Sequence, residues 1–287
     1  MKKTSKSTIV CIFGSLLLAV FVSVSAILIS VKIGFASEHA IMNALDDVDY
    51  YLIVYDDFMG KCESLAIPNG LNATVFNDVF SMEQIHSDGS GYLKAELNST
   101  PFEIDLKGYK QKLSKNIYAY VKKNNLTADG DAKEIVADFT NEIMDYYLDI
   151  IRVPHAASMG AVVRAISVYF PFLFAAMILL SVCTIWILIK QNPRKKSRLF
   201  RYLSYSIMSG AVSTLIVPFF CGITKFYKKL QIYPEYLYEF IVNYLENGSY
   251  VMLIIGLLLF AAGGVLICLS CCMEYQKTHR NIKKIRT

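Results

Sequence analysis

Residues 9–31 read IVCIFGSLLLAVFVSVSAILISV, a run of 23 residues without a charged side chain. At about 1.5 Å per residue, a helix of this length crosses the roughly 30 Å hydrocarbon core of a bilayer. A cleavable signal peptide has an apolar region of only about 7 to 15 residues. We therefore predict a retained transmembrane helix at 9–31. Cleavage at the small residues near Ala26 or Ala36 is the alternative.

Three further apolar blocks of similar length predict transmembrane helices at 161–189, 202–224 and 250–272. Apolar residues make up 54% of the 287 residues and charged residues 18%, whereas a soluble domain averages about 45 to 50% apolar. This composition argues against an ordinary cytosolic enzyme. The fold class we predict is all-α, with four transmembrane helices.

Lys and Arg cluster in the three segments that flank these blocks, 1–8, 190–201 and 273–287. Positively charged flanks stay in the cytoplasm. We therefore predict a cytoplasmic tail at 1–8, a basic cytoplasmic loop at 190–201 and a second basic cytoplasmic tail at 273–287, in a multi-pass protein of the cell membrane. Such clusters attract the anionic headgroups of a lipid bilayer, so the bilayer is the expected partner and nucleic acid is not.

Residues 32–160 lie between the first two predicted spans and are far more numerous than a connection needs. Their apolar residues recur every three or four positions without sustained alternation, which predicts helices rather than strands. We expect an extracytoplasmic helical domain here, inserted between spans 1 and 2. Three amphipathic stripes mark its helices: Ile41, Leu45, Val48, Leu52, Tyr55 and Met59; Leu106, Tyr109, Leu113, Ile117, Tyr120 and Val121; and Ile135, Phe139, Ile143, Tyr146 and Ile150.

Clusters of turn-forming residues divide this domain at 68–70, 87–91 and 129–131. A short helix is predicted around Val75 to Gln84, and residues 100–103 predict the cap of the second striped helix. The short extracytoplasmic loop 225–249 contains Pro234, which predicts the start of an amphipathic helix over 235–245. Two positions remain open for that helix: the membrane interface, or a lid against the large domain.

Seven cysteines raise the question of disulfides and metal sites. Only Cys62 falls outside the predicted spans and their cytoplasmic ends, so no intrachain bridge is expected in an oxidising compartment. A buried free thiol is the preferred interpretation, and a link between two copies is the alternative. The pair Cys268 and Cys271 has the spacing of a zinc or redox motif but no second pair.

No motif for a reaction is present, and the acidic and histidine residues have simpler explanations. The acids from Asp46 to Asp57 suit a solvated helix face, with cation binding as the alternative. His39 and His155, with Glu38, would form a zinc pair only if brought together, and we interpret them as surface residues. We predict no catalytic residue, no cofactor-binding residue and no metal ligand, and we expect a protein that is not an enzyme.

Three residues at predicted membrane edges have a special interpretation. Arg164 is a charge at the edge of the second span, where its guanidinium would extend to the lipid headgroups. Gly34 and Pro154 flank the extracytoplasmic domain and are possible hinges, because glycine permits unusual backbone angles and proline breaks the helix hydrogen-bond ladder. The alternative for both residues is that they only end helices.

The four-span layout, with a large first and a small second exterior loop, is similar in topology to FtsX-type permease-like subunits. Those subunits pass the state of a cytoplasmic ATPase to an exterior partner, and no motif is shared with them. The function we expect is that the extracytoplasmic domain binds a protein partner in the envelope, as a sensor or scaffold. A transporter or permease-like subunit with a separate ATPase is the alternative. Richness in Lys, Ile, Tyr and Asn suggests a bacterial source, in which the sequons at Asn72, Asn98, Asn125 and Asn247 would have no meaning.

Overall fold

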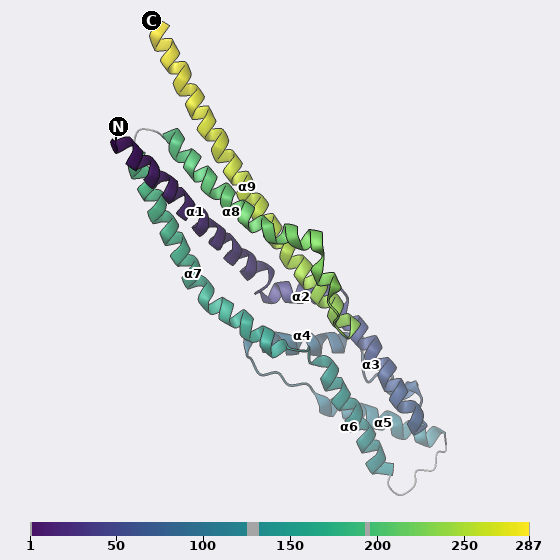
Figure 1. Ribbon diagram of the computed structural model, residues 1–287. Coiled ribbons are helices and arrows are strands. Elements are labelled where there is room, and N and C mark those ends of the chain that lie inside the picture. The colour runs from purple at the N-terminus through teal and green to yellow at the C-terminus, as the bar shows by residue number, and fades with distance from the viewer. Residues whose placement is uncertain (1, 125–131, 193–195, 287) are drawn as a thin grey trace. The chain divides into compact units, whose positions relative to one another are not determined.

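The computed structural model of the chain describes residues 2–124, 132–192 and 196–286. Every regular element in these residues is a helix (Figure 1), which confirms the predicted all-α class. The chain divides into two compact units. The membrane unit comprises 1–40, 165–231 and 242–287, and the aromatic unit, named after its core, comprises 41–164 and 232–241.

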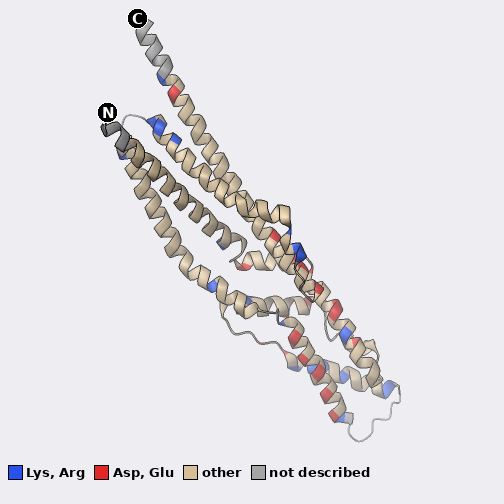
Figure 2. Cartoon of the chain, in the orientation of Figure 1, with Lys and Arg blue, Asp and Glu red and all other residues tan. Residues whose placement is uncertain are grey.

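Four long helices supply the apolar sequence of the membrane unit: α1 (Lys2–Gly34), α7 (Ala156–Gln191), α8 (Lys196–Thr224) and α9 (Glu235–Arg286). Within the described residues, four helical stretches are long and apolar enough to cross a membrane. Lys, Arg, Asp and Glu are missing from their middle portions (Figure 2). A helix suits a bilayer because it pairs its own backbone polar groups. The chain is therefore a multi-pass membrane protein.

Small residues let α1 and α8 pack closely along one another. A Cβ atom on Gly210 of α8 would lie 2.7 Å from Val22 Cγ1 of α1. One turn away, Ser206 Oγ donates a hydrogen bond of 2.7 Å to the carbonyl of Ser15. Small residues at fourfold spacing in α8 thus permit close contact between the two helices.

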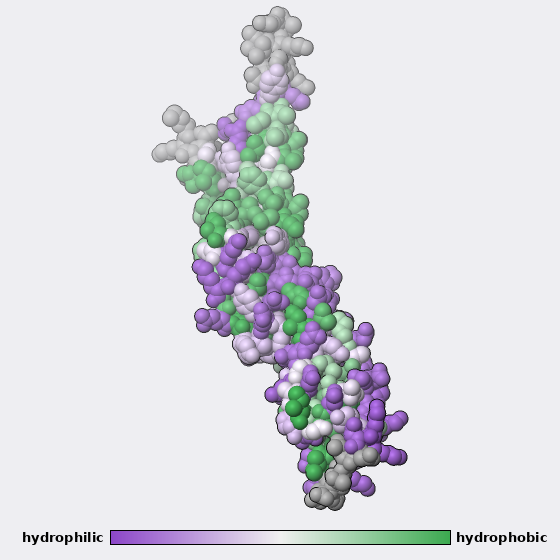
Figure 3. Space-filling model, turned by 90° about the vertical axis from the view of Figure 1, so that its right-hand side faces the viewer, coloured by the Kyte–Doolittle hydropathy of each residue, from purple (hydrophilic) through white to green (hydrophobic). Residues whose placement is uncertain are grey.

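The helix α9 meets α8 through a second set of small residues. Ser204 Oγ donates to the carbonyl oxygen of Gly263 over 2.7 Å, and a Cβ atom on Gly263 would lie 2.5 Å from Met208 Cγ. The short 3₁₀ helix η3 (Phe226–Lys229) follows α8. Outside these contacts, the long helices expose apolar side chains, which form the broad green band in the upper half of Figure 3.

The aromatic unit consists of shorter helices that pack in pairs, with α3 against α4, α6 and η2, α4 against α6, and α5 against α6 and η2. Its large rings fill the core, where Tyr50, Phe58, Phe76 and Tyr147 are almost fully buried. The elements are α2 (Glu38–Asp46), α3 (Tyr50–Ala66), η1 (Ile67–Asn69), η2 (Ala73–Phe76), α4 (Met82–Asn98), α5 (Leu106–Lys123) and α6 (Ala132–Ile151).

The first predicted stripe, 41–59, is not one helix. The chain turns between α2 and α3, and Asp49 takes a left-handed conformation with φ of 49°, which Asp tolerates better than most residues. This break changes the buried face of α3. Leu52 is exposed, whereas Tyr51, Val54 and Phe58 are buried.

The predicted turn at 87–91 was wrong, because these residues lie inside α4. Their glycines serve close packing: a Cβ atom on Gly89 would lie 2.4 Å from the ring of Tyr51, and one on Gly91 would lie 2.6 Å from the ring of Phe102. The helix begins instead at a capping box, in which Ser81 and Gln84 bond each other's backbone amides. The short helix predicted from Val75 to Gln84 is likewise replaced by η2 and the start of α4.

The other two stripes were closer to the structure. In α5, Tyr109, Leu113 and Ile117 are buried as predicted. The cap of α5 is Asp105, whose carboxylate accepts from the Gly108 amide, and not the predicted segment 100–103. In α6, Phe139, Ile143 and Ile150 are buried, whereas Ile135 is exposed. The predicted turn at 129–131 and the sequon at Asn125 lie outside the described residues.

The helix predicted over 235–245 does not end there, because α9 runs from Glu235 to Arg286. Asn247, Gly248 and Ser249 resemble a loop in the sequence but lie within this helix. A Cβ atom on Gly248 would lie 2.2 Å from the ring of Phe35. Glycine is thus needed at position 248 because the ring of Phe35 occupies the space of a side chain.

Candidate functional site

Both α7 and α9 contribute residues to each unit, and the contacts that they make within each unit are the candidate functional features. Residues 156–164 of α7 and 235–241 of α9 belong to the aromatic unit, and the remainder of each helix belongs to the membrane unit.

The first turns of α9 pack on α3 through aromatic rings. Tyr50 lies edge-on to Tyr236 and to Phe240, with ring centroids 5.4 and 6.1 Å apart. Tyr50 and Phe240 are 1% and 2% exposed. This burial favours the lid interpretation of the segment over an interfacial helix. Burial, with smaller effects from Tyr236 and Tyr51, raises the pKa of Tyr50 far above its usual value.

The start of α7 is fixed to the end of α4 by Arg164. Its Nη1 donates hydrogen bonds to the carbonyl oxygens of Glu96 and Leu97, the latter over 3.2 Å. The last carbonyls of a helix lack partners within the helix, and a cation there is favoured by the helix dipole. Gly160 permits the contact, since a Cβ atom on it would lie 2.4 Å from the Glu96 oxygen. The guanidinium thus has protein partners, where the sequence suggested lipid headgroups.

In the aromatic unit, two tyrosine hydroxyls bind one carboxylate, an arrangement that we call the clasp. Asp88 Oδ2 accepts hydrogen bonds from Tyr147 over 2.6 Å and from Tyr109 over 2.8 Å. The ring of Phe80 stacks on both tyrosines. Burial, with a contribution from Asp88, raises the pKa of Tyr109 to about 12. This clasp joins α4, α5 and α6 into one body.

Sequence reasoning missed the clasp, because Asp88 was assigned to a turn and Tyr146 was placed on the buried stripe instead of Tyr147. The capping pair of Ser81 and Gln84 was the available signal for the start of α4. With α4 started there, Asp88 falls on a helix, next to the buried position Gly89.

The two possible hinges lie at helix ends. Gly34 is the last residue of α1, and a Cβ atom on it would lie 3.1 Å from Val251 Cβ of α9. Just beyond it, the carbonyl of Phe35 accepts a hydrogen bond from the Tyr244 hydroxyl. Pro154 lies between α6 and α7, followed by His155 with φ of 63°. Close packing is a sufficient reason for Gly34, and the hinge role of both residues stays a prediction.

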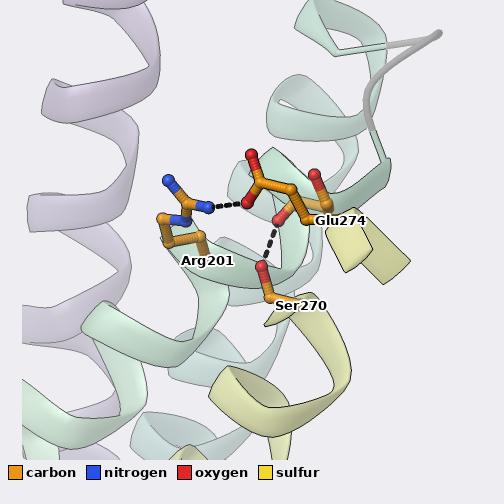
Figure 4. Close-up of polar contacts among 4 residues, drawn as sticks. Arg201, Ser270 and Glu274 are labelled. Carbon is orange, nitrogen blue, oxygen red and sulfur yellow. Dashed lines mark hydrogen bonds and ion pairs between the residues drawn. The ribbon is translucent and has the colours of Figure 1, made fainter. Parts of the chain in front are cut away.

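Polar contacts also join the first turns of α8 to α9 (Figure 4). Arg201 Nη2 forms an ion pair with Glu274 Oε2, and Ser270 Oγ donates to the carbonyl of Ser197 over 2.8 Å. Both Arg201 and Ser197 belong to the predicted basic loop 190–201, of which 193–195 lie outside the described residues. Exposed ion pairs add little stability. These contacts mark turns of α8 and α9 that are adjacent.

Within the described residues, no group of three or more His, Cys, Asp or Glu side chains is arranged to hold a metal ion. Among the acids of α2 and α3, Asp46 lies with its Oδ1 atom 3.5 Å from Nε2 of His86. Cys62 is a free and fully buried thiol, and burial raises its pKa to about 12.

These features define a class: a multi-pass membrane protein in which two of the four apolar helices also belong to a second, aromatic-cored helical unit. Comparison of the chain with protein-family models, with characterised proteins and with solved structures found no match.

Proposed function

We propose that the chain is a cell-membrane protein whose aromatic unit lies outside the cytoplasm and binds a protein partner in the envelope, as a sensor or scaffold. The three basic segments support this orientation, with both termini in the cytoplasm, since positive flanks are retained there. In this arrangement the aromatic unit corresponds to the predicted extracytoplasmic domain 32–160, joined by part of the loop 225–249.

The sharing of α7 and α9 between the two units is the observation that carries the proposal. If the membrane helices served only to anchor the aromatic unit, two of them would not need to contribute residues to the core of that unit. Here Arg164 holds α7 to α4, and Tyr50 holds α9 to α3. A partner that shifts α3 or α4 would therefore act directly on two membrane helices.

The other end of α9 is where the effect would be read. There, Arg201 of α8 forms an ion pair with Glu274 of α9. The thiols of Cys271 and Cys272 are exposed within one turn of Glu274. They supply native reporters of any movement of α9 on the proposed cytoplasmic side.

Orientation is tested by an impermeant maleimide on intact cells. Cys62 should be labelled only after mild denaturation, because it is fully buried, and Cys62→Ser should remove the signal. Cys271 and Cys272 are exposed and should be labelled only after the membrane is permeabilised. Labelling of either from outside would overturn the orientation.

Partner binding is tested with a photoreactive amino acid at exposed apolar positions of the aromatic unit, such as Ile67 and Ile135, which are 66% and 59% exposed. The control is Phe172, 73% exposed in the apolar stretch of α7. The proposal expects a discrete adduct with one protein from the aromatic unit and none from Phe172. A scan that also covers Leu52, Phe102 and Tyr118 without any adduct would contradict it.

Two further readouts separate the roles. A sensor changes the maleimide rate at Cys271 when the partner is present, and a scaffold leaves that rate unchanged. The permease-like alternative instead predicts an adduct between an ATPase and the described basic residues 196–201.

A further inference from the structure

An open groove runs between α8 and α9 in the membrane unit. It has a volume of about 420 Å³, and its walls are formed by Val212, Leu215, Ile216, Phe219, Leu253 and Leu257. Every lining side chain is apolar, and the helical segments 212–219 and 253–257 that form the walls contain no charged residue. In a bilayer, such a groove is filled by hydrocarbon.

The groove lies beside a close contact between α8 and α9. Where Gly256 faces α8, the side chain of Leu215 takes the space of a Cβ atom. Beyond this contact the walls stay open, and Ile216, Phe219 and Leu257 are 60%, 70% and 52% exposed. Pro218 lies inside α8 at the same level, where it cannot donate a backbone hydrogen bond.

A basic cluster follows the groove directly. Helix α8 ends at Thr224, about 7.5 Å along the axis from Phe219 at 1.5 Å per residue. Lys225, Lys228 and Lys229 come next, and all three are exposed. Lys228 Nζ lies 3.8 Å from Glu246, which neutralises part of its charge. Lys225 and Lys229 form no ion pair within the described residues. The cluster appears as blue at the end of α8 in Figure 2.

We propose that the groove and this cluster together bind one anionic phospholipid, with an acyl chain between α8 and α9 and the phosphate at Lys225 and Lys229. Charge complementarity selects the occupant: an apolar slot takes any acyl chain, but lysines at its end favour a negative headgroup. Each basic residue near a membrane surface raises the affinity for anionic lipid about fivefold. The site is independent of which face of the membrane the aromatic unit occupies.

The test places a fluorescent reporter in the groove of the full-length protein. Phe219→Trp is combined with Trp186→Phe, so that the new indole is the sole tryptophan. The protein is reconstituted in phosphatidylcholine nanodiscs with increasing fractions of phosphatidylglycerol or phosphatidylcholine that carries brominated chains. Bromine quenches a tryptophan that it contacts.

The proposal expects brominated phosphatidylglycerol to quench at a fraction at least tenfold lower than brominated phosphatidylcholine does. Lys225→Gln with Lys229→Gln should abolish this preference, while the matched double variant Lys122→Gln with Lys123→Gln in α5 should keep it. Equal quenching by the two lipids in the reporter protein would overturn the proposal. Absence of quenching by both lipids would also overturn it, and crosslinking of Phe219 positions between two copies would then assign the groove to a helix–helix contact.

Discussion

The aromatic unit packs large rings against one another, whereas the membrane unit packs backbones against small residues. In the first, Phe58, Phe80 and Tyr147 lie within 5.5 Å of each other by ring centroids. In the second, Gly210 allows α1 to approach α8 closely, and Ser204 donates a hydrogen bond to the carbonyl of Gly263. The two units of one chain are therefore packed in two different ways.

The difference follows from the solvent around each unit. In water, burying a ring removes apolar area from water, and this is the dominant favourable term in folding. In lipid, the surroundings are as apolar as the side chains, so helices gain from close van der Waals packing and interhelical hydrogen bonds instead. The comparison predicts that ring deletions damage one unit and added side chains damage the other.

One buried thiol in each unit can report its opening. Cys62 is 0% exposed in the aromatic unit, and Cys11 is 2% exposed in the membrane unit. Two single-cysteine variants, one that retains only Cys62 and one that retains only Cys11, allow the labelling rate of each unit to be measured separately in detergent. Protection of the thiol then gives the free energy of opening.

The largest effect is expected from Tyr147→Ala. It removes a fully buried ring and a 2.6 Å hydrogen bond to Asp88, at a cost of about 3 to 5 kcal/mol. Cys62 labelling should accelerate while Cys11 labelling stays unchanged. Tyr118→Ala, at a 44% exposed position, is the control and should change neither rate. Equal acceleration at both thiols would mean that the units do not open separately.

The second effect is the loss of the Arg164 contact. Arg164→Gln removes a charged donor from the carbonyls of Glu96 and Leu97, which we expect to cost about 1.5 to 3 kcal/mol. Cys62 protection is the measurement. Arg164→Lys separates two explanations: lysine serves a headgroup contact as well as arginine does, but it lacks the fork of donors. Full retention of protection in Arg164→Lys would remove the helix-end explanation.

The third prediction concerns the membrane unit and expects the opposite pattern of thiol labelling from the first. Gly210→Leu places a side chain where Val22 packs, and overpacking of this kind costs about 1 to 3 kcal/mol. Here Cys11 should lose protection and Cys62 should keep it. Gly264→Leu is the matched control, because no atom lies within 4 Å of a Cβ at that position. A loss of equal size in both variants would mean that bulk, not the α1 contact, decides.

The same contrast explains what the sequence revealed. The four apolar helices were predictable because a bilayer imposes length and charge limits that composition records. The stripe of Tyr109, Leu113 and Ile117 was predictable because one uninterrupted helix keeps its period.

The errors came from contacts distant in sequence. Gly89 and Gly248 look like turn or loop residues, yet each lies inside a helix where a ring of Tyr51 or of Phe35 takes the place of a side chain. A glycine in the sequence can indicate either a turn or a close contact inside a helix, and the neighbouring residues alone do not distinguish the two. The turn at Asp49 likewise shifted the buried face of α3 from Leu52 to Tyr51.

The smallest effect tests whether a hydrogen bond in the membrane unit is worth more than its counterpart in water. Ser204 Oγ is buried and donates to the Gly263 carbonyl, and measured interhelical bonds of this kind average about 0.6 kcal/mol. Ser204→Ala should therefore reduce Cys11 protection only about threefold, since Tyr202 and Leu203 beside it pack against the Cys11 core.

Ser213→Ala is the control for this comparison, because Ser213 bonds the carbonyl of Ser209 within its own helix. A loss above about 2 kcal/mol for Ser204→Ala, beyond the range measured for such bonds, would mean that polar bonds hold the membrane unit together. A small loss would instead assign most of the α8–α9 association to the close approach that Gly263 allows. The membrane unit would then depend on shape, as the aromatic unit depends on burial of rings.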